Sequence, residues 1–364
     1  MISFTPTEEQ QQLVEVIRRY AVSDVQPVAH EADEHERVPG DVVRTGWEIG
    51  LVPTAIPEAM GGLGEMSAIT NVLAAEEFAY GDLATALQVL APALFAYPLV
   101  LYGTEAQKQL YLPQFLDERP AHFSAALVEP GVFFDPHDLK TTARVEGGKI
   151  LINGVKSAVP LAAVANAMLV YARDDGGKAA AYIVEADAHG VEIGAREKLL
   201  GVRALPTHRV TFKDAAVDLD CKLGGETGAD VQALLNRSWT ALAALGVGVA
   251  RYAFEYARDY AKQRVQFGVP IAQKQAIAFM LAEMAIEVDA ARLMVWEAAW
   301  KLDRGEDATR EAYLARQYSD KAAMFVTDAA VQVLGGYGFI REYPVERLLR
   351  NARGLATFDG LAII

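Results

Sequence analysis

The chain has 364 residues, of which 52% are hydrophobic and 23% charged, so it can bury a sizeable core and is expected to divide into two or three domains. These proportions exclude a disordered chain and a disulfide-stapled miniprotein. The 48 acidic residues outnumber the 34 lysines and arginines, and the resulting net charge of −14 argues against nucleic acid as a partner.

Cellular context is indicated by three features. Cys221 is the only cysteine, so no internal disulfide can form, which suits a reducing cytosol. The first residues contain no basic segment leading into an apolar run, so no signal peptide is expected. The most apolar stretch, 87–102, contains Pro92 and Pro98 and is shorter than the about 20 apolar residues of a spanning helix. A cytoplasmic protein with no membrane span is therefore predicted.

Residues 1–120 show the spacing of amphipathic helices and predict an N-terminal helical domain. Thr7 is placed to cap a first helix, with acidic residues in its first turn. Helical spacing returns at 66–80 and again at 104–116, where Leu110 and Phe115 are expected to face inward.

The pattern changes near residue 120, and residues 121–225 predict a compact central β domain. Gly147 and Gly148 separate two extended runs, which is typical of a hairpin. The strand-like runs are 123–128, 141–145, 149–152, 167–172, 179–184 and 208–212.

Helical periodicity then dominates residues 226–364, the predicted C-terminal helical bundle. The run 231–263 would form a helix about 50 Å long, and 273–302 and 307–333 carry similar patterns. Because the connections are short, these helices are expected to pack antiparallel. The predicted fold class is mainly α with a central β barrel or sandwich.

Two sequence motifs accompany this order of domains. One is RVQFGVPI at 264–271, and the other is QVLGGYG at 332–338, continued by REYPVERLLRNAR at 341–353. IPEAMGGLG at 56–64, EPG at 129–131 and EKLLG at 197–201 add to the pattern. Over nearly its whole length the chain resembles the acyl-CoA dehydrogenase family, which implies a C-terminal four-helix bundle.

The resemblance implies an FAD-dependent oxidoreductase whose substrate is an acyl-CoA thioester. In the family a carboxylate removes the α-proton, the β-hydride passes to flavin N5, and electrons leave to an electron-transferring flavoprotein. FAD lies between subunits, so a dimer or a dimer of dimers is implied, either homomeric or heteromeric. The cofactor-binding positions implied here are Arg264, Gln266, Phe267, Gln275, Gln332, Gly335, Gly336 and Val128.

The residue types in these motifs suit a nucleotide cofactor. Arg264 offers a forked cation for a pyrophosphate, and Gly335 and Gly336 let the backbone approach a ligand closely. A second interpretation remains open. In it, Arg264 only marks the C-terminal end of a helix, where the helix dipole is negative, and the two glycines only cap a helix. Arg264 and Gln332 are expected to face a subunit interface.

Asp359 is the predicted catalytic base. In the family a Tyr-Glu-Gly-Thr run follows the arginine-rich segment, and here FDGL at 358–361 places Asp359 at the position of the glutamate. A carboxylate in an apolar cleft can act as a general base, but aspartate is one methylene shorter, so its reach falls by about an ångström. Some family members that act on alicyclic acyl-CoAs resemble this chain in using aspartate. Asp359 can also be read as the start of an Asp-Gly turn.

The motifs for the flavin ring depart from the family. VEPGVFFD at 128–135 has Val128 in place of threonine, and KSAVP at 156–160 has Ala158 and Pro160 in place of tryptophan and threonine. Asn236 to Trp239, where other members place the base or grip CoA, contains no acid. Several hydrogen-bonding groups expected around the ring are therefore missing.

Three functions compete. The first is an acyl-CoA dehydrogenase with Asp359 as base. The second is a partner subunit of an α2β2 dehydrogenase that lends Arg264 and Gln332 to its neighbour's FAD, and the third is a non-catalytic acyl-CoA-binding scaffold. No metal site is predicted, because His30 and His35 lie on what reads as a solvated helix face. The stripe of Tyr252, Tyr256 and Tyr260 is interpreted as bundle packing.

Overall fold

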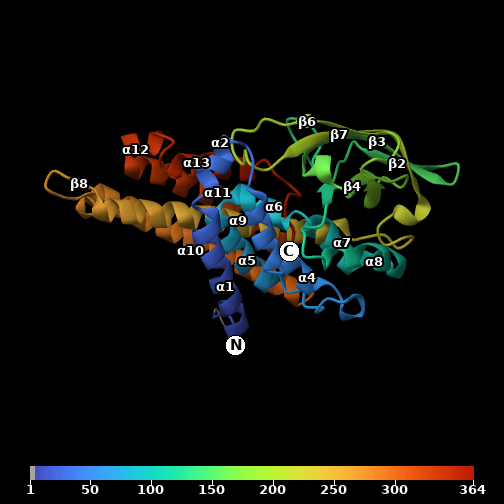
Figure 1. Cartoon of the computed structure of the whole chain (residues 1–364), viewed down its shortest axis with the longest axis horizontal. Helices are drawn as coiled ribbons and strands as arrows, with labels where there is room; N and C mark the ends of the chain where they lie inside the picture. The colour runs from blue at the N-terminus through green and yellow to red at the C-terminus, as the bar shows by residue number, and fades with distance from the viewer. Residues whose placement is uncertain (1–4) are drawn as a thin grey trace.

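The computed structural model describes residues 5–364, so the first four residues, on which the expectation of no signal peptide partly rests, lie outside the described residues. Helices lead into a curled β-sheet, and long helices follow it (Figure 1). The sheet lies at the upper right of Figure 1, and the long helices run from there to the hairpin labelled β8 at the far left. The predicted fold class, mainly α with a central β domain, is confirmed.

The N-terminal helices pack around a shared apolar core. They are α1 (Glu8–Tyr20), α2 (Ala29–Glu34), α3 (Gly40–Glu48), α4 (Leu51–Ala55), α5 (Ala68–Gly81), α6 (Leu83–Leu90), α7 (Ala93–Tyr102) and α8 (Glu105–Tyr111). Thr7 caps α1 as predicted, since its hydroxyl accepts the Gln10 N–H at 3.2 Å while the Gln10 side chain accepts the Thr7 N–H at 2.9 Å.

The inward orientation predicted for Phe115 is confirmed, but that predicted for Leu110 is wrong. Phe115 is fully buried, whereas Leu110 is 63% exposed. The reason is a change of period, because α8 ends at Tyr111 and a 3₁₀ turn follows over Leu112–Phe115. A 3₁₀ turn has about three residues per turn, so a single helical period carried across it assigns Leu110 to the wrong face.

The central sheet has seven strands. They are β1 (Phe123–Ala126), β2 (Thr142–Glu146), β3 (Lys149–Pro160), β4 (Ala167–Arg173), β5 (Ala179–Glu185), β6 (Val191–Arg196) and β7 (Thr207–Asp218). The order is β1-β4-β2-β3-β7-β6, with β5 also paired to β4, and β1 runs parallel to β4. The hairpin predicted at Gly147 and Gly148 joins β2 to β3. The sequence missed β6, an edge strand with no buried side chain and hence no apolar alternation.

The C-terminal region is built on three long helices. These are α9 (Val231–Gln263), α10 (Gln275–Asp303) and α11 (Thr309–Leu334), followed by α12 (Gly336–Phe339) and α13 (Val345–Leu355). A small hairpin of β8 (Val265–Gln266) and β9 (Val269–Pro270) joins α9 to α10. Ala253, Ala257 and Ala261 recur every fourth residue on α9 and are fully buried, so neighbouring helices can approach α9 closely.

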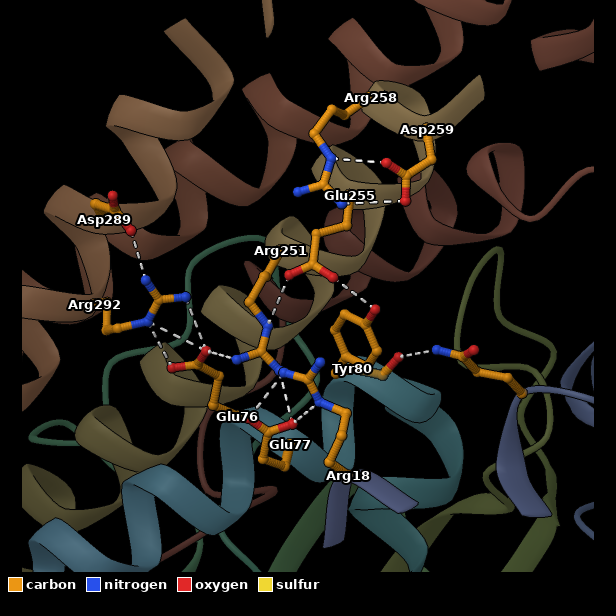
Figure 2. A network of polar contacts seen from close by, with 11 residues as sticks. Arg18, Glu76, Glu77, Tyr80, Arg251, Glu255, Arg258, Asp259, Asp289 and Arg292 are labelled. Atoms are coloured by element: carbon orange, nitrogen blue, oxygen red, sulfur yellow. Dashed lines mark hydrogen bonds and ion pairs between the residues drawn. The ribbon is translucent and has the colours of Figure 1, made fainter. Parts of the chain in front are cut away.

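A buried charge network joins the N-terminal helices to this bundle. Figure 2 shows Arg18 of α1 and Arg251 of α9 converging on Glu77 of α5, while Arg292 of α10 reaches the neighbouring Glu76. The Arg251 Nη2 to Glu77 Oε2 distance is 2.8 Å, and Arg292 Nη2 lies 3.0 Å from Glu76 Oε1. Four helices are thus tied together through two adjacent glutamates.

Across residues 5–364, no single helix is long and apolar enough to cross a membrane. The bent pair α6 and α7 passes the test of length and composition only when its two helices are taken together, with a 42° angle between them. Most side chains of this pair are buried inside the protein.

Candidate functional site

A groove of about 810 Å³ opens at the hairpin end of the bundle. The β8–β9 hairpin, the start of α10, the end of α11 and α12 form its walls. Five of the predicted cofactor residues line it together: Arg264, Gln266, Phe267, Gly335 and Gly336. Segments about 70 residues apart in the sequence therefore meet at one place, as the helical hairpin geometry requires.

The other predicted site residues lie outside this groove. Gln275 is the exposed first residue of α10, and Gln332 is exposed on the last turn of α11, each next to residues that line the groove. Val128 and Asp359 lie elsewhere, where the sheet meets the bundle.

The groove is cationic and aromatic. The Arg264 guanidinium lies 5.2 Å from the centre of the Tyr337 ring, and Lys274 Nζ lies 5.7 Å from that of Phe267. Neither cation pairs with a carboxylate within the described part of the chain, so both charges are available to an anion. Lys274 and Tyr337 were not among the residues predicted from the sequence, although Tyr337 lies within the motif at 332–338 and Lys274 follows the motif at 264–271 by three residues.

The glycines at the end of α11 leave room for a ligand. Gly335 has φ +60°, a left-handed conformation that favours glycine. A Cβ added at Gly335 or Gly336 would meet no protein atom within 4 Å. Packing within this chain therefore does not explain the missing side chain at Gly336.

The tyrosine stripe of α9 lines a second groove of about 500 Å³. Tyr252, Tyr256 and Tyr260 face it, and Tyr260 and Arg264 are shared with the larger groove. Packing accounts for part of the stripe, since the centre of the Tyr252 ring lies 5.1 Å from that of Tyr80 and 6.2 Å from that of Tyr256. The three tyrosines also border the open groove.

Asp359 lies in a turn after α13, where the C-terminal segment meets the sheet. Its neighbour Gly360 has φ +67°, and a Cβ there would lie 2.7 Å from Leu127 Cδ2 just beyond β1. Gly360, Leu127 and Ser238 are among the residues that line a cavity of about 20 Å³ between sheet and bundle. This volume is about enough for one water molecule.

Two charged side chains of α11 lie beside this turn. The Arg316 guanidinium donates hydrogen bonds to the carbonyl oxygens of Leu355 and Phe358 and to the Asp320 carboxylate. The pKa of Asp320 is raised to about 6, because burial, with a smaller contribution from the nearby Asp359, outweighs the opposing effect of Arg316. Neither residue could be predicted from the sequence, because isolated charges on a helix form no recognisable pattern.

A buried ion pair lies under the end of β1. Lys156 Nζ donates to Leu127 O and to Glu129 Oε1, both at 2.9 Å. The pKa of Lys156 is lowered to about 8, because burial outweighs the opposing effect of the Glu129 carboxylate. The pair fixes the backbone on both sides of Val128.

The three domains of acyl-CoA dehydrogenases match this chain in order. The N-terminal domain matches residues 7–119, the middle domain 124–215 and the C-terminal domain 228–362. An acyl-CoA dehydrogenase of Bacillus subtilis is 34% identical over 97% of this chain and 95% of its own length. The cyclohex-1-ene-1-carbonyl-CoA dehydrogenase of Syntrophus aciditrophicus is 35% identical over 97% of this chain and 87% of its own.

The same similarity holds in three dimensions. The structure of butyryl-CoA dehydrogenase from Megasphaera elsdenii superposes with a TM-score of 0.90 at 29% identity, covering 100% of this chain and 96% of that one. The chain therefore belongs to the acyl-CoA dehydrogenase family. It is an oxidoreductase of the class that acts on CH–CH bonds, and FAD is the cofactor of this family.

The hairpin-end groove fits the adenosine diphosphate half of FAD. Arg264 and Lys274 supply unpaired positive charge suited to a pyrophosphate. Tyr337 offers an aromatic face, and the open backbone at Gly335 and Gly336 allows close approach.

The sheet end, formed by Val128, Ala158 and Pro160, fits the flavin ring less well than the hairpin-end groove fits the adenosine diphosphate half. Val128 and Ala158 have no side-chain donor, and one backbone group of each is engaged: Val128 O accepts the Ser157 N–H at 2.9 Å, and Ala158 N–H donates to Glu197 at 3.0 Å. Pro160 O accepts the Ser124 hydroxyl. The departures noted in the sequence thus leave few free hydrogen-bonding groups at this end.

Proposed function

We propose that this chain acts in the FAD-dependent α,β-dehydrogenation of an acyl-CoA thioester, with Asp359 as the base that removes the α-proton. The observation that carries this proposal is the place of Asp359 in a tightly held turn between sheet and bundle, beside Gly360 in the wall of an apolar cavity. The names of the relatives, which include butyryl-CoA and cyclohex-1-ene-1-carbonyl-CoA dehydrogenases, support an acyl-CoA substrate.

The chain's own residues have separate tasks in this proposal. Arg264 and Lys274 hold a pyrophosphate in the hairpin-end groove. Gln332 and Gln275 of the same chain contact the same ligand, which lies at a subunit interface. When bound, FAD supplies the hydride acceptor, and an electron-transferring flavoprotein or similar acceptor then takes the electrons. The acyl group enters between sheet and bundle, where it displaces residues that line the 20 Å³ cavity.

Asp359→Asn tests the proposed base, because it removes the carboxylate while keeping the shape of the side chain. Bleaching of the flavin by a panel of acyl-CoAs should slow by about 10²–10⁴-fold, the usual contribution of a general base. Bound flavin should remain. Asp359→Glu restores the reach of the family's glutamate and should favour straight-chain acyl groups. Bleaching of Asp359→Asn at the wild-type rate would contradict the assignment.

A second function is favoured by the poor fit at the sheet end. In this alternative the chain is the partner subunit of a mixed dehydrogenase and lends its hairpin-end groove to the FAD of a neighbour. The visible spectrum of the chain purified alone separates the two. One FAD per chain supports the first function, whereas FAD bound only after co-expression with a second dehydrogenase chain supports the second. Absence of FAD in both preparations would favour a scaffold.

A further inference from the structure

The last turn of α13 ends beside a buried arginine. The final carbonyl groups of a helix lack partners within the helix, and a cation there also interacts favourably with the helix dipole. Arg316, which is only 3% exposed, meets both needs, since its Nη2 donates to Leu355 O and also to Phe358 O at 3.2 Å. Leu355 is the last residue of α13, and Phe358 directly precedes Asp359.

The turn that carries Asp359 is therefore held from two sides. Arg316 holds the carbonyl oxygens on its N-terminal side. On its C-terminal side, Gly360 lies so close to Leu127 that a Cβ would overlap it. The turn also closes on itself, because Phe358 N–H donates to Leu355 O at 3.1 Å. The backbone of Asp359 has little freedom to shift.

Asp320 completes the arrangement. It lies one helical turn after Arg316 on α11 and accepts a hydrogen bond from Arg316 Nη1, leaving Nη2 to reach the turn. The charged groups that act on Asp320 are Arg316 on its own helix and Asp359 on the turn. Asp320 and Asp359 thus lie close enough to interact electrostatically, and Arg316 is bonded to the first and to the backbone just before the second.

We propose that Arg316 is a positioning residue for Asp359, and that Asp320 fixes the Arg316 guanidinium and tunes the charge around the base. This inference rests on the proposed role of Asp359 as base. Because a displacement of about 1 Å at a reacting group can cost about 10²-fold in rate, loss of the Arg316 hydrogen bonds should slow proton removal strongly.

The test compares Arg316→Met, Arg316→Lys and Asp320→Asn with the wild-type holoenzyme, including any partner subunit that co-purifies. Single-turnover flavin bleaching is measured against acyl-CoA concentration. Arg316→Met should lower the limiting rate about 10²-fold while half-saturation stays within about twofold, and Arg316→Lys should recover part of the loss. Arg310→Met is the matched control, since Arg310 lies on the same helix with its side chain 80% exposed, and it should bleach at the wild-type rate.

Two further measurements distinguish positioning from a merely structural role. Hydrogen exchange of the backbone amides in 356–361 should become about tenfold faster in Arg316→Met, while the amides of α9 stay protected. Asp320→Asn should lower the pH at which the bleaching rate is half-maximal, because a nearby negative charge favours the protonated form of a carboxyl group. A purely structural defect would lower the rate equally at every pH.

The outcomes separate this inference from the proposed function. If Asp359→Asn is inactive but Arg316→Met bleaches at the wild-type rate, or leaves exchange in 356–361 unchanged, the positioning role is wrong and the base assignment stands. If Asp359→Asn bleaches like the wild type, or no acyl-CoA bleaches the wild type, the proposed function fails and the inference fails with it. If Arg316→Met does not fold, the partial rescue by Arg316→Lys and the pH shift of Asp320→Asn decide whether the positioning role is correct.

Discussion

Lys156 shows how one buried charge shapes the end of the sheet. It is fully buried, and Glu129, its partner, also accepts the N–H groups of Lys140 at 2.7 Å and Thr141 at 2.8 Å. Burial alone would raise the pKa of Glu129, but the charge of Lys156 and these hydrogen bonds outweigh it and hold that pKa below its ordinary value. The pair therefore stays charged at neutral pH.

Lys156→Met should leave the Glu129 carboxylate buried without its cation. Removing one partner of a buried pair costs about 3–5 kcal/mol, so the free energy of unfolding should fall by that amount in urea denaturation. Lys149→Met is the control, because Lys149 pairs with Asp218 at the surface and its loss should change the free energy of unfolding little. Equal losses in the two variants would contradict this account.

At the scale of single residues, site residues that belong to a recognisable motif can be predicted from the sequence. Residues that only tertiary packing brings together cannot. Arg264, Gly335 and Gly336 could be placed in one site because their motifs are recognisable. Arg316 and Asp320 could not, since their importance depends on where the end of α13 lies relative to α11. That contact joins residues about 40 positions apart and has no local signal.

At the scale of elements, long helices with a strong period were predicted well. The predicted 231–263 matches the bounds of α9, and 307–333 lies close to those of α11. The exposed strand β6 and the break between α8 and the following 3₁₀ turn were not predicted, because neither carries a periodic apolar signal.

The glutamates of α5 link four helices, and this linkage should depend on pH. Burial would raise the pKa of Glu77, but Arg18 and Arg251 outweigh burial and lower it. A carboxyl group whose pKa is lowered by folding stabilises the protein above its unfolded pKa of about 4.3, and this contribution disappears as the pH falls through the lower, folded value. Acid should therefore loosen the contact between the N-terminal helices and the bundle.

Glu77→Gln tests this coupling. The variant should be about 3–5 kcal/mol less stable at pH 7, because Glu77 is buried and its replacement by an amide leaves Arg18 and Arg251 without their shared carboxylate. The stability difference from wild type should shrink as the pH falls below about 4, since the wild type then loses the same charge. Glu105→Gln, on an exposed pair with Lys108, should change stability little at any pH. A difference for Glu77→Gln that is constant from pH 7 to pH 3 would contradict the argument.

At the scale of the whole molecule, α10 presents an apolar stripe to the outside of the bundle. Phe279, Ile286, Leu293 and Trp300 recur every seven residues and are 60%, 63%, 49% and 38% exposed. A seven-residue apolar repeat is the pattern of a helix that packs along another helix, and this stripe is about 32 Å long. Exposed apolar surface of this extent is typical of an interface between subunits.

Ile286→Glu places a charge at the middle of this stripe and should weaken the assembly. If α10 packs against a second subunit, the variant should shift to a smaller species, measured by light scattering after size exclusion. Its helical content and cooperative unfolding should stay as in the wild type, because Ile286 contributes little to the core of its own chain. Leu110→Glu is the matched control, since Leu110 on α8 is equally exposed, at 63%, but lies outside the stripe. The control should keep the wild-type mass. If both variants keep it, the α10 stripe is not part of an interface, and the subunit contact proposed at the hairpin-end groove would have to be formed by another face of the bundle.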